Sequence, residues 1–136
     1  VHGASTLGVV ASTAAYRGGR DWLDDVNAYL DGNRRLLGTL LAEHLPEVGF
    51  RQPEATYLAW LDVRAVDLDD SPARFFRDQA AVTLTDGGLC GTGYERHARF
   101  VFAMPRPLLR ESVQAMADAV HRRPKNRHHD RIERVS

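Results

Sequence analysis

The chain has 136 residues, of which 43% are hydrophobic and 26% are charged, a composition typical of one globular domain with its own core. A single cysteine excludes an internal disulfide, and no apolar run approaches the roughly 18 residues of a membrane span, which together favour a reduced, cytoplasmic location. The formal net charge is zero, although residues 122–136 hold six basic side chains against two acidic ones. The N-terminus shows no targeting pattern.

Two helices are predicted at the start of the chain. Small and apolar side chains fill residues 5–16, which predicts a helix packed closely against another element, and the glycine pair at 18–19 ends it. Apolar residues then recur three and four positions apart over residues 21–45, which predicts a long amphipathic helix that Pro46 stops. Gly32 lies inside this helix and marks a candidate bend.

Two strands are predicted next. Residues 48–52 favour a short strand, and T-Y-L-A-W-L-D-V over residues 56–63 predicts a central strand covered on both faces, because it is rich in β-branched and aromatic residues and has no polar face. We interpret Tyr57 and Trp60 as core side chains, with stacking on a cofactor as the less favoured alternative. Asp62 should neutralise an arginine, and the nearest one follows two residues later.

Two more helices are predicted in the second half of the chain. Ser71 as N-cap and Pro72 at the first helical position start one that should run to Ala81 and turn its phenylalanines inward. A final amphipathic helix should cover the sheet with Leu109, Val113, Met116 and Val120. Residues 122–136 are expected to form a basic tail that is disordered or loosely helical. The H-H-D run at 128–130 resembles a metal cluster by composition only, so no metal site is predicted.

Residues 82–105 hold the most informative pattern in the chain. Glycines at positions 87, 88, 91 and 93 let the backbone approach a ligand or a second strand closely, and residues 98–104 then read as a buried strand interrupted by Arg99. An arginine in an apolar run is costly to bury unless a carboxylate or a phosphate binds its guanidinium group. An anion at Arg99 and an ordinary hairpin, with Arg99 at the sheet edge paired to a surface Asp or Glu, both remain open.

Three charged residues precede this strand. We interpret Arg96 and His97 as rim residues of the Arg99 site. A histidine next to a carboxylate pocket could titrate near neutral pH. Glu95 is a candidate partner for Arg96, His97 or Arg99.

Five segments follow in order along residues 2–120. They are S-T-L-G-V-V-A-S-T-A-A-Y from Ser5, G-R-D-W-L-D-D from Gly19, Y-L-D-G-N-R-R-L-L from Tyr29, P-E-A-T-Y-L-A-W-L-D-V-R from Pro53, and G-x-x-C-G-T-G with a later R-F-V-F-A-M-P-R from Gly87. Together they resemble the C-terminal part of the class I/II aminotransferase superfamily of fold type I. The resemblance is strongest to its cystathionine β-lyase (cysteine-S-conjugate β-lyase) branch, which uses pyridoxal 5′-phosphate.

The resemblance implies an α/β architecture with a small α+β domain, in which helices flank a mixed sheet and a long helix joins two domains. Residues 1–20 would be what this chain holds of the cofactor-binding large domain, and residues 21–46 would be the linking helix. Residues 47–121 would form the C-terminal small domain, followed by the tail at 122–136. The complete enzyme would be a homodimer, of which this chain is the C-terminal part.

The resemblance also implies a chemistry. Arg99 matches the arginine that grips the α-carboxylate of an amino-acid substrate, in an α,β-elimination that releases a thiol, pyruvate and ammonia. An aminotransferase on the same scaffold would use the same arginine, and a truncated, non-catalytic module is a third hypothesis. Val101 stands where the family usually has Asn and Cys90 where it usually has Phe, so the pocket wall departs from the usual pattern.

The implied cofactor is pyridoxal 5′-phosphate, which such enzymes hold on a lysine. The only lysine of this chain is Lys125, in the polar tail, and the family places the cofactor lysine upstream of the matching segment. We therefore predict no catalytic residue here and expect the chain to be inactive by itself. Nucleic acid is not predicted as a partner of the tail, because no aromatic residue interleaves with its basic side chains.

Overall fold

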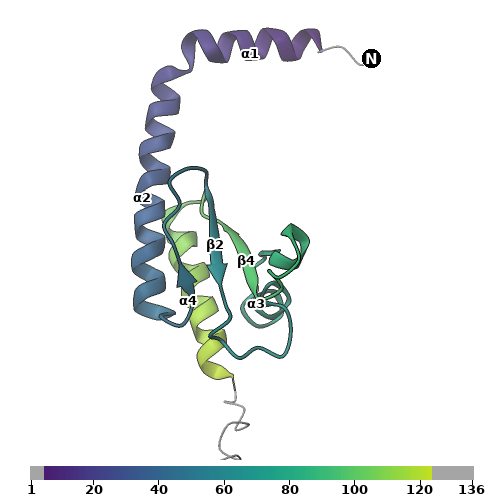
Figure 1. Ribbon diagram of the computed structural model, residues 1–136. Helices are drawn as coiled ribbons and strands as arrows, with labels where there is room; N and C mark the ends of the chain where they lie inside the picture. The colour runs from purple at the N-terminus through teal and green to yellow at the C-terminus, as the bar shows by residue number, and fades with distance from the viewer. Residues whose placement is uncertain (1–4, 124–136) are drawn as a thin grey trace, which may run out of the picture.

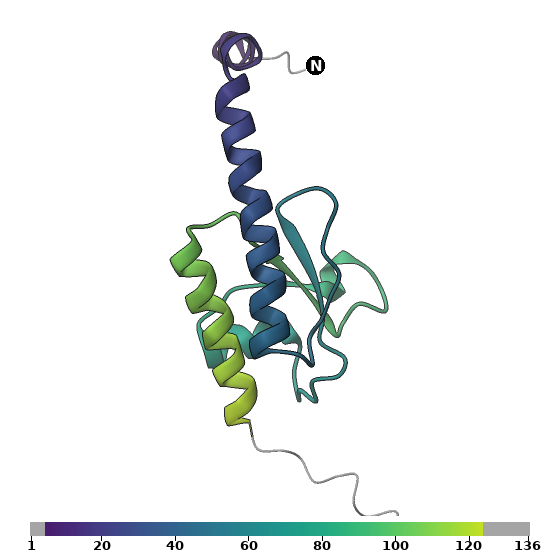
Figure 2. The same ribbon diagram turned by 90° about the vertical axis from the view of Figure 1, so that its left-hand side faces the viewer.

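The computed structural model describes residues 5–123. Along them follow the elements α1 (Thr6–Gly18), α2 (Arg20–His44), β1 (Gly49–Phe50), β2 (Leu58–Asp62), α3 (Pro72–Ala80), β3 (Thr85–Asp86), the 3₁₀ helix η1 (Gly87–Cys90), β4 (His97–Val101) and α4 (Arg106–Arg122). The strands form one sheet with α2, α3 and α4 packed on one side of it (Figures 1 and 2). α1 stands apart from the sheet, across the far end of α2.

α1 forms as predicted but has no buried residue. Ser5 caps it by accepting a hydrogen bond from the backbone N–H of Gly8, at 3.3 Å. At Gly19 the chain turns into α2, and a Cβ atom there would lie 2.6 Å from the carbonyl oxygen of Ala15, so glycine is required. Its apolar side chains are exposed within the described residues, so the predicted close packing of this helix stays a prediction.

The surroundings of α2 change along its length. Its C-terminal half gives the core Leu37, Leu40 and Leu41. Near its N-terminus, Trp22 is 69% exposed. The helix ends at His44, as the proline two residues later predicts. It runs unbroken through Gly32, so the candidate bend is wrong: a Cβ atom there would lie 2.6 Å from a guanidinium nitrogen of Arg106, and the glycine makes room for that side chain.

The sheet has the strand order β1-β2-β4-β3. The prediction of a central strand in residues 56–63 is therefore confirmed as β2. Every neighbouring pair is antiparallel, where the sequence analysis expected a mixed sheet. β2 and β3 do run in the same direction, but β4 inserts between them and pairs with both in the opposite direction, so no parallel neighbours arise.

Side chains alternate between the two faces of the sheet. We call the buried side, beneath the helices, the covered face; it carries Ala59, Leu61, Ala98 and Phe100. The opposite side, which we call the open face, carries Leu58, Trp60 and Asp62 of β2 and His97, Arg99 and Val101 of β4. The prediction that β2 is covered on both faces is wrong for the described residues, because its side chains alternate between full and partial burial.

α3 confirms its predicted start, and α4 confirms its predicted buried face. Ser71 accepts a hydrogen bond from the backbone N–H of Arg74, at 3.3 Å, and Pro72 is the first helical residue. α3 ends at Ala80, because Ala81 takes a left-handed conformation with φ of 55°. α4 buries the four predicted residues Leu109, Val113, Met116 and Val120.

Asn33 ties α2 to the segment that follows β4. Its side-chain amide is fully buried and donates hydrogen bonds to the carbonyl oxygens of Phe102, at 2.9 Å, and Met104, at 2.8 Å. Its Oδ1 accepts a third hydrogen bond from Arg106 Nε, at 3.3 Å. This network fixes where the chain leaves the sheet and enters α4.

None of the helices within residues 5–123 combines the length and the apolar character that crossing a bilayer requires. Nor do those residues bring together three or more His, Cys, Asp or Glu side chains in a way that could hold a metal ion. The predicted tail from residue 124 onward, with its H-H-D run, lies outside the described residues.

Candidate functional site

Arg99 lies in the interior of the open face. Its strand, β4, is flanked by β2 and β3, and the register places Arg99 opposite Trp60 on one side and Thr85 on the other. A position at the sheet edge, as in the ordinary-hairpin alternative, is therefore wrong. The guanidinium Nη2 donates a hydrogen bond to Thr85 Oγ1 at 3.3 Å. The Nε atom is buried and has no hydrogen-bond partner among residues 5–123.

No described carboxylate neutralises Arg99: within residues 5–123 its guanidinium group has no Asp or Glu oxygen within 4.0 Å. Arg64, by comparison, forms an ion pair with Asp62 at 2.6 Å. A half-buried guanidinium group with an unfilled donor favours binding of an external carboxylate or phosphate, because those groups match its fork of N–H donors. This is the feature that makes the open face a candidate binding site.

The glycine-rich loop folds back onto the start of β4. Gly87 is its tightest position, since a Cβ atom there would lie 2.2 Å from the carbonyl oxygen of Tyr94 and 2.5 Å from that of His97. Gly93 has φ of 91°, a conformation that favours glycine. Of the two predicted reasons for these glycines, the structure therefore shows the close approach to a second segment of backbone.

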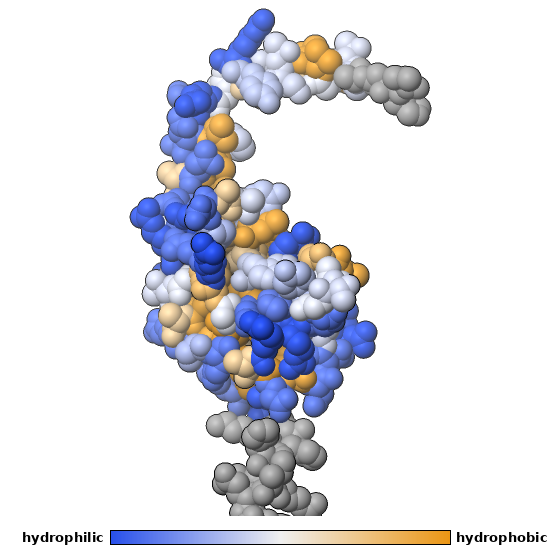
Figure 3. Space-filling model, in the orientation of Figure 1, coloured by the Kyte–Doolittle hydropathy of each residue, from blue (hydrophilic) through white to orange (hydrophobic). Residues whose placement is uncertain are grey.

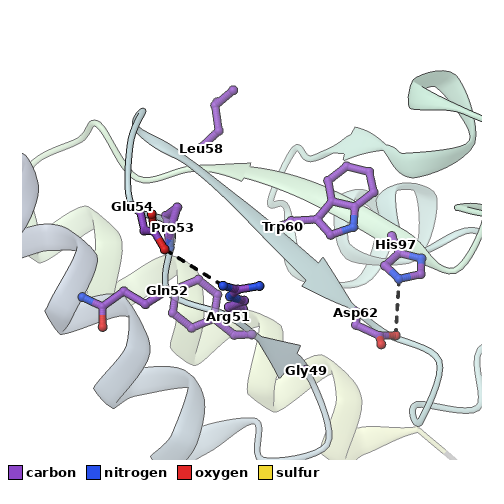
Figure 4. Close-up of a pocket in the computed structure, with 10 residues that line it drawn as sticks. Gly49, Arg51, Gln52, Pro53, Glu54, Leu58, Trp60, Asp62 and His97 are labelled. Atoms are coloured by element: carbon purple, nitrogen blue, oxygen red, sulfur yellow. Dashed lines mark ion pairs between the residues drawn. The ribbon is translucent and has the colours of Figure 1, made fainter.

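His97 is buried in an aromatic cluster two residues before Arg99. Its ring stacks on Trp60 with the ring centroids 5.6 Å apart, and Tyr94 meets both rings edge-on. His97 Nε2 lies 3.7 Å from the carboxylate of Asp62, the contact drawn as a dashed line in Figure 4. The cluster fixes the indole of Trp60 beside Arg99 on the open face.

The predicted neutralisation of Asp62 is confirmed, and its partner is Arg64. The guanidinium Nε and Nη2 atoms donate to the two carboxylate oxygens at 2.9 and 2.6 Å, a bidentate contact. These side-chain hydrogen bonds lower the pKa of Asp62 from 3.8 to about 2. The carboxylate therefore stays ionised at every physiological pH.

The interpretation of Arg96 and His97 as rim residues is wrong. Arg96 reaches across to the loop after β2 and donates hydrogen bonds to the carbonyl oxygens of Val66, at 3.0 Å, and Leu68, at 2.7 Å. It therefore holds that loop in place. His97 is only 8% exposed, because Trp60 covers its ring.

Two further interpretations near the site are corrected. Tyr57 is 50% exposed and Trp60 is half-buried on the open face, so neither belongs to the core. Glu95 forms no ion pair within the described residues. Its carboxylate instead accepts a hydrogen bond from the backbone N–H of Gly93 at 3.0 Å, which lowers the pKa of Glu95.

A pocket of about 650 Å³ hollows the open face next to Trp60 (Figure 4). Trp60, Asp62 and His97 line it from β2 and β4, and residues 49–54 line it from β1 and the chain that follows it. Figure 4 shows Trp60 and His97 together on one side of this space and the 51–54 segment facing them. Arg99 does not line the pocket, although it lies on the same face.

No protein-family model matches the chain. Its sequence is 45% identical to a protein of Mycobacterium tuberculosis assigned to the cystathionine β-lyases, over 85% of this chain and 33% of that protein. Its structure matches a Corynebacterium diphtheriae protein assigned as a pyridoxal-phosphate-dependent β-cystathionase, with a TM-score of 0.87 and 37% identity over 90% of this chain and 33% of that one. Over the third that it matches, this chain is homologous to the cystathionine β-lyases. A pyridoxal-phosphate-bound C–S lyase of Staphylococcus hominis, a solved structure, matches with a TM-score of 0.82 and 37% identity over 87% of this chain and 32% of that one.

The chain spans about a third of the length of the cystathionine β-lyases that it matches. The resemblance drawn from the five sequence segments is thus confirmed, and so is the α/β fold that it implied. The boundaries of the implied domains stay a prediction.

The two departures from the usual cystathionine β-lyase pattern lie at exposed positions. Val101 is 42% exposed and follows Arg99 on the open face, where it pairs with Leu58 of β2. Cys90 ends η1 in the glycine-rich loop, and its thiol is exposed. Neither substitution disturbs the core.

Sequence reasoning missed Thr85 and Tyr94 as parts of this site. Thr85 contacts Arg99 across a strand pair, and Tyr94 completes the aromatic cluster from the loop. The alternation of the short β3 segment could have suggested an outward threonine, but two residues are too few for a period-two pattern to be recognised.

Proposed function

We propose that this chain is the C-terminal part of a pyridoxal-phosphate-dependent carbon–sulfur β-lyase, and that Arg99 binds the α-carboxylate of its amino-acid substrate. The observation that carries the proposal is the un-neutralised guanidinium group on the open face, with its unpartnered Nε atom. The names of the relatives add support, since they include a cystathionine β-lyase of Corynebacterium glutamicum and the C–S lyase of S. hominis.

In this proposal Arg99 holds and orients the substrate. Two parallel N–H donors of its guanidinium group match the two oxygens of a carboxylate, which fixes the position of the neighbouring Cα atom. The reaction removes the Cα proton, breaks the bond between Cβ and sulfur and consumes water, so that a cysteine S-conjugate yields a thiol, pyruvate and ammonia. Partial burial of Arg99 strengthens its attraction for the carboxylate, because less water competes.

By likeness to the relatives, the cofactor of this reaction is pyridoxal 5′-phosphate, which when bound withdraws electrons from the substrate Cα atom. The described residues do not fit its attachment, because the only lysine of the chain, Lys125, lies outside them. We therefore assign no cofactor contact and no catalytic acid or base to residues 5–123. The proposed contribution of this chain is substrate binding.

The exposed apolar side chains of α1 and of the N-terminal half of α2 support a two-domain arrangement. Figure 3 shows hydrophobic residues along this arm, away from the sheet. The most exposed include Leu7 at 81%, Tyr16 at 94% and Trp22 at 69%. Such surface is usually covered by a partner. We propose that residues 1–20 pack with a cofactor-binding large domain and that residues 21–46 link it to the small domain, residues 47–121. We also propose, only from the resemblance to the relatives, that the complete enzyme is a cytoplasmic homodimer.

A chimera tests the proposed reaction. This chain would replace the matching third of the S. hominis C–S lyase, and turnover of S-methyl-L-cysteine would be followed by release of methanethiol and pyruvate. We expect Arg99→Gln to lower kcat/KM about 100-fold while the absorbance of bound cofactor is unchanged, since a bidentate contact between two charges is lost. Arg110→Gln, at an exposed arginine on α4, is the matched control and should keep full turnover.

The outcomes separate the three hypotheses. Unchanged turnover after Arg99→Gln, or loss of cofactor with unchanged substrate affinity, would contradict the carboxylate-binding role. Exchange of the substrate amino group with a 2-oxo acid, without release of thiol, would favour an aminotransferase on the same scaffold. A chimera that binds cofactor and catalyses neither reaction would favour a non-catalytic module.

A further inference from the structure

Thr85 is the side chain that hydrogen-bonds to Arg99 within the described residues. β3 pairs with β4, and the register sets Thr85 directly opposite Arg99 on the open face. Arg99 Nη2 donates to Thr85 Oγ1 at 3.3 Å. The contact thus comes from a neighbouring strand of the same sheet.

The chemistry of this partner matters because a hydroxyl group carries no charge. An aspartate or glutamate at position 85 would neutralise the guanidinium group of Arg99 and compete with an incoming carboxylate. A threonine hydroxyl accepts one hydrogen bond and leaves the positive charge, the buried Nε and the remaining N–H donors for a ligand. It also restrains a long side chain that would otherwise lose rotamer freedom on binding.

The other neighbouring strand limits the movement of Arg99 as well. Trp60 lies opposite Arg99 on β2. Its indole is held by His97, with ring centroids 5.6 Å apart, and by Tyr94, at 5.4 Å. The Arg99 side chain is therefore bounded by a fixed aromatic ring on one strand and by the Thr85 hydroxyl on the other.

We propose that Thr85 is a positioning residue, which orients Arg99 for the carboxylate of an amino-acid substrate and leaves its charge un-neutralised. The inference rests on the proposed function of Arg99 and names the group that prepares it. Thr85 acts through Arg99 in this proposal and needs no contact with the reacting atoms.

The test uses nuclear magnetic resonance of the chimera defined above, without cofactor and labelled with ¹⁵N at arginine, because this chain is proposed to be one part of the complete enzyme. The Nε–Hε signal of Arg99 is assigned by its loss in Arg99→Lys and is followed during titration with S-methyl-L-cysteine. The control ligand is S-methylcysteamine, which has the same amine and thioether but no carboxylate. We expect a saturable shift of the Arg99 signal with the amino acid and none with the amine.

Three variants at one position isolate the role of the hydroxyl group. Thr85→Val keeps the shape and removes the acceptor, so binding should weaken about tenfold, the loss of one hydrogen bond to a charged group. The Nε–Hε order parameter of its ligand-free form should fall as well. Thr85→Ser keeps the acceptor and should stay within about twofold of the wild type. Thr85→Asp should abolish binding, because its carboxylate occupies Arg99.

The failure of this inference is distinguishable from the failure of the proposed function. If Thr85→Val binds the amino acid like the wild type and keeps the same order parameter, Thr85 does not position Arg99, while the role of Arg99 stands. If the wild-type Arg99 signal responds to no carboxylate, the proposed function falls and this inference falls with it. The backbone spectrum of each variant checks that the fold is intact.

Discussion

The covered face and the open face of the sheet are built from the same strands but have different roles: the first packs the core, and the second presents side chains that are available for binding. On β4, Ala98 and Phe100 are 0% and 2% exposed beneath the helices, while Val101 on the open face is 42% exposed. The covered face is apolar and closely packed, whereas the open face combines an aromatic cluster, an ion pair and an un-neutralised arginine. Alternation along one strand therefore separates the residues that stabilise the fold from those available for binding.

Substitutions at two adjacent residues of β4, Phe100 and Val101, should differ most in their effect on the free energy of unfolding. We expect Phe100→Ala to lower the free energy of unfolding by about 3–5 kcal/mol, because it leaves a cavity in the hydrophobic core. Val101→Ala should cost less than about 1 kcal/mol, since its side chain is already partly in water. Urea denaturation of both variants measures the difference, and equal losses would mean that the open face is packed as tightly as the covered one.

Asn33 of α2 is a buried polar side chain on the covered side of the sheet, and its hydrogen bonds should also stabilise the fold. We expect Asn33→Ala to lower the free energy of unfolding by about 2 kcal/mol, because the buried carbonyl oxygen of Phe102 and the partly buried one of Met104 lose their donor. Asn27→Ala, at an exposed position of the same helix, should stay within about 0.5 kcal/mol of the wild type. Thermal unfolding of the pair checks this, and a neutral Asn33→Ala would show that the end of β4 needs no tie to α2.

The ionisation of Asp62, on the open face, should make the stability of the fold depend on pH. Its pKa in the folded chain is about 2, below the ordinary 3.8, so its ion pair with Arg64 stabilises the fold above about pH 4 and is lost as the pH falls toward 2. We expect a small stabilisation from this contact, because solvent screens an ion pair whose arginine is exposed. Asp62→Asn should remove that part of the acid titration, and Asp69→Asn, at an exposed loop carboxylate, should leave it in place. Identical acid profiles for the wild type and Asp62→Asn would refute the assignment.

The smallest expected change in stability belongs to Arg99. Arg99→Gln should alter the free energy of unfolding by less than about 0.5 kcal/mol, because within the described residues the removed charge has no ionic partner and only one hydrogen bond is lost. Urea denaturation of this variant, set beside the turnover of the chimera, separates binding from folding. A loss above about 2 kcal/mol would make Arg99 a structural residue and weaken its proposed role.

Local patterns in the sequence were sufficient for most of the helices. The three-and-four spacing of apolar residues predicted α2 and α4 and the face that α4 buries. Ser71 with Pro72 predicted the start of α3, and the glycine pair at 18–19 predicted the end of α1. These features depend on neighbours within one or two turns, so they can be read from the chain alone. The arginine inside an apolar strand likewise marked Arg99 before its surroundings were known.

The composition of the site depended on contacts between segments far apart in the sequence. No local pattern could tell that β4 inserts between β2 and β3, which makes the sheet antiparallel and moves Arg99 from an edge to the interior. The same pairing brings Thr85 to Arg99, and stacking on Trp60 buries His97. Sequence by itself determined the four α-helices, the central strand and the residue with the unusual charge, because these follow from local spacing and from the cost of burying a charge. Only the tertiary structure decided which face of the sheet stays open and which side chains meet there, because strand order and register are set by long-range pairing.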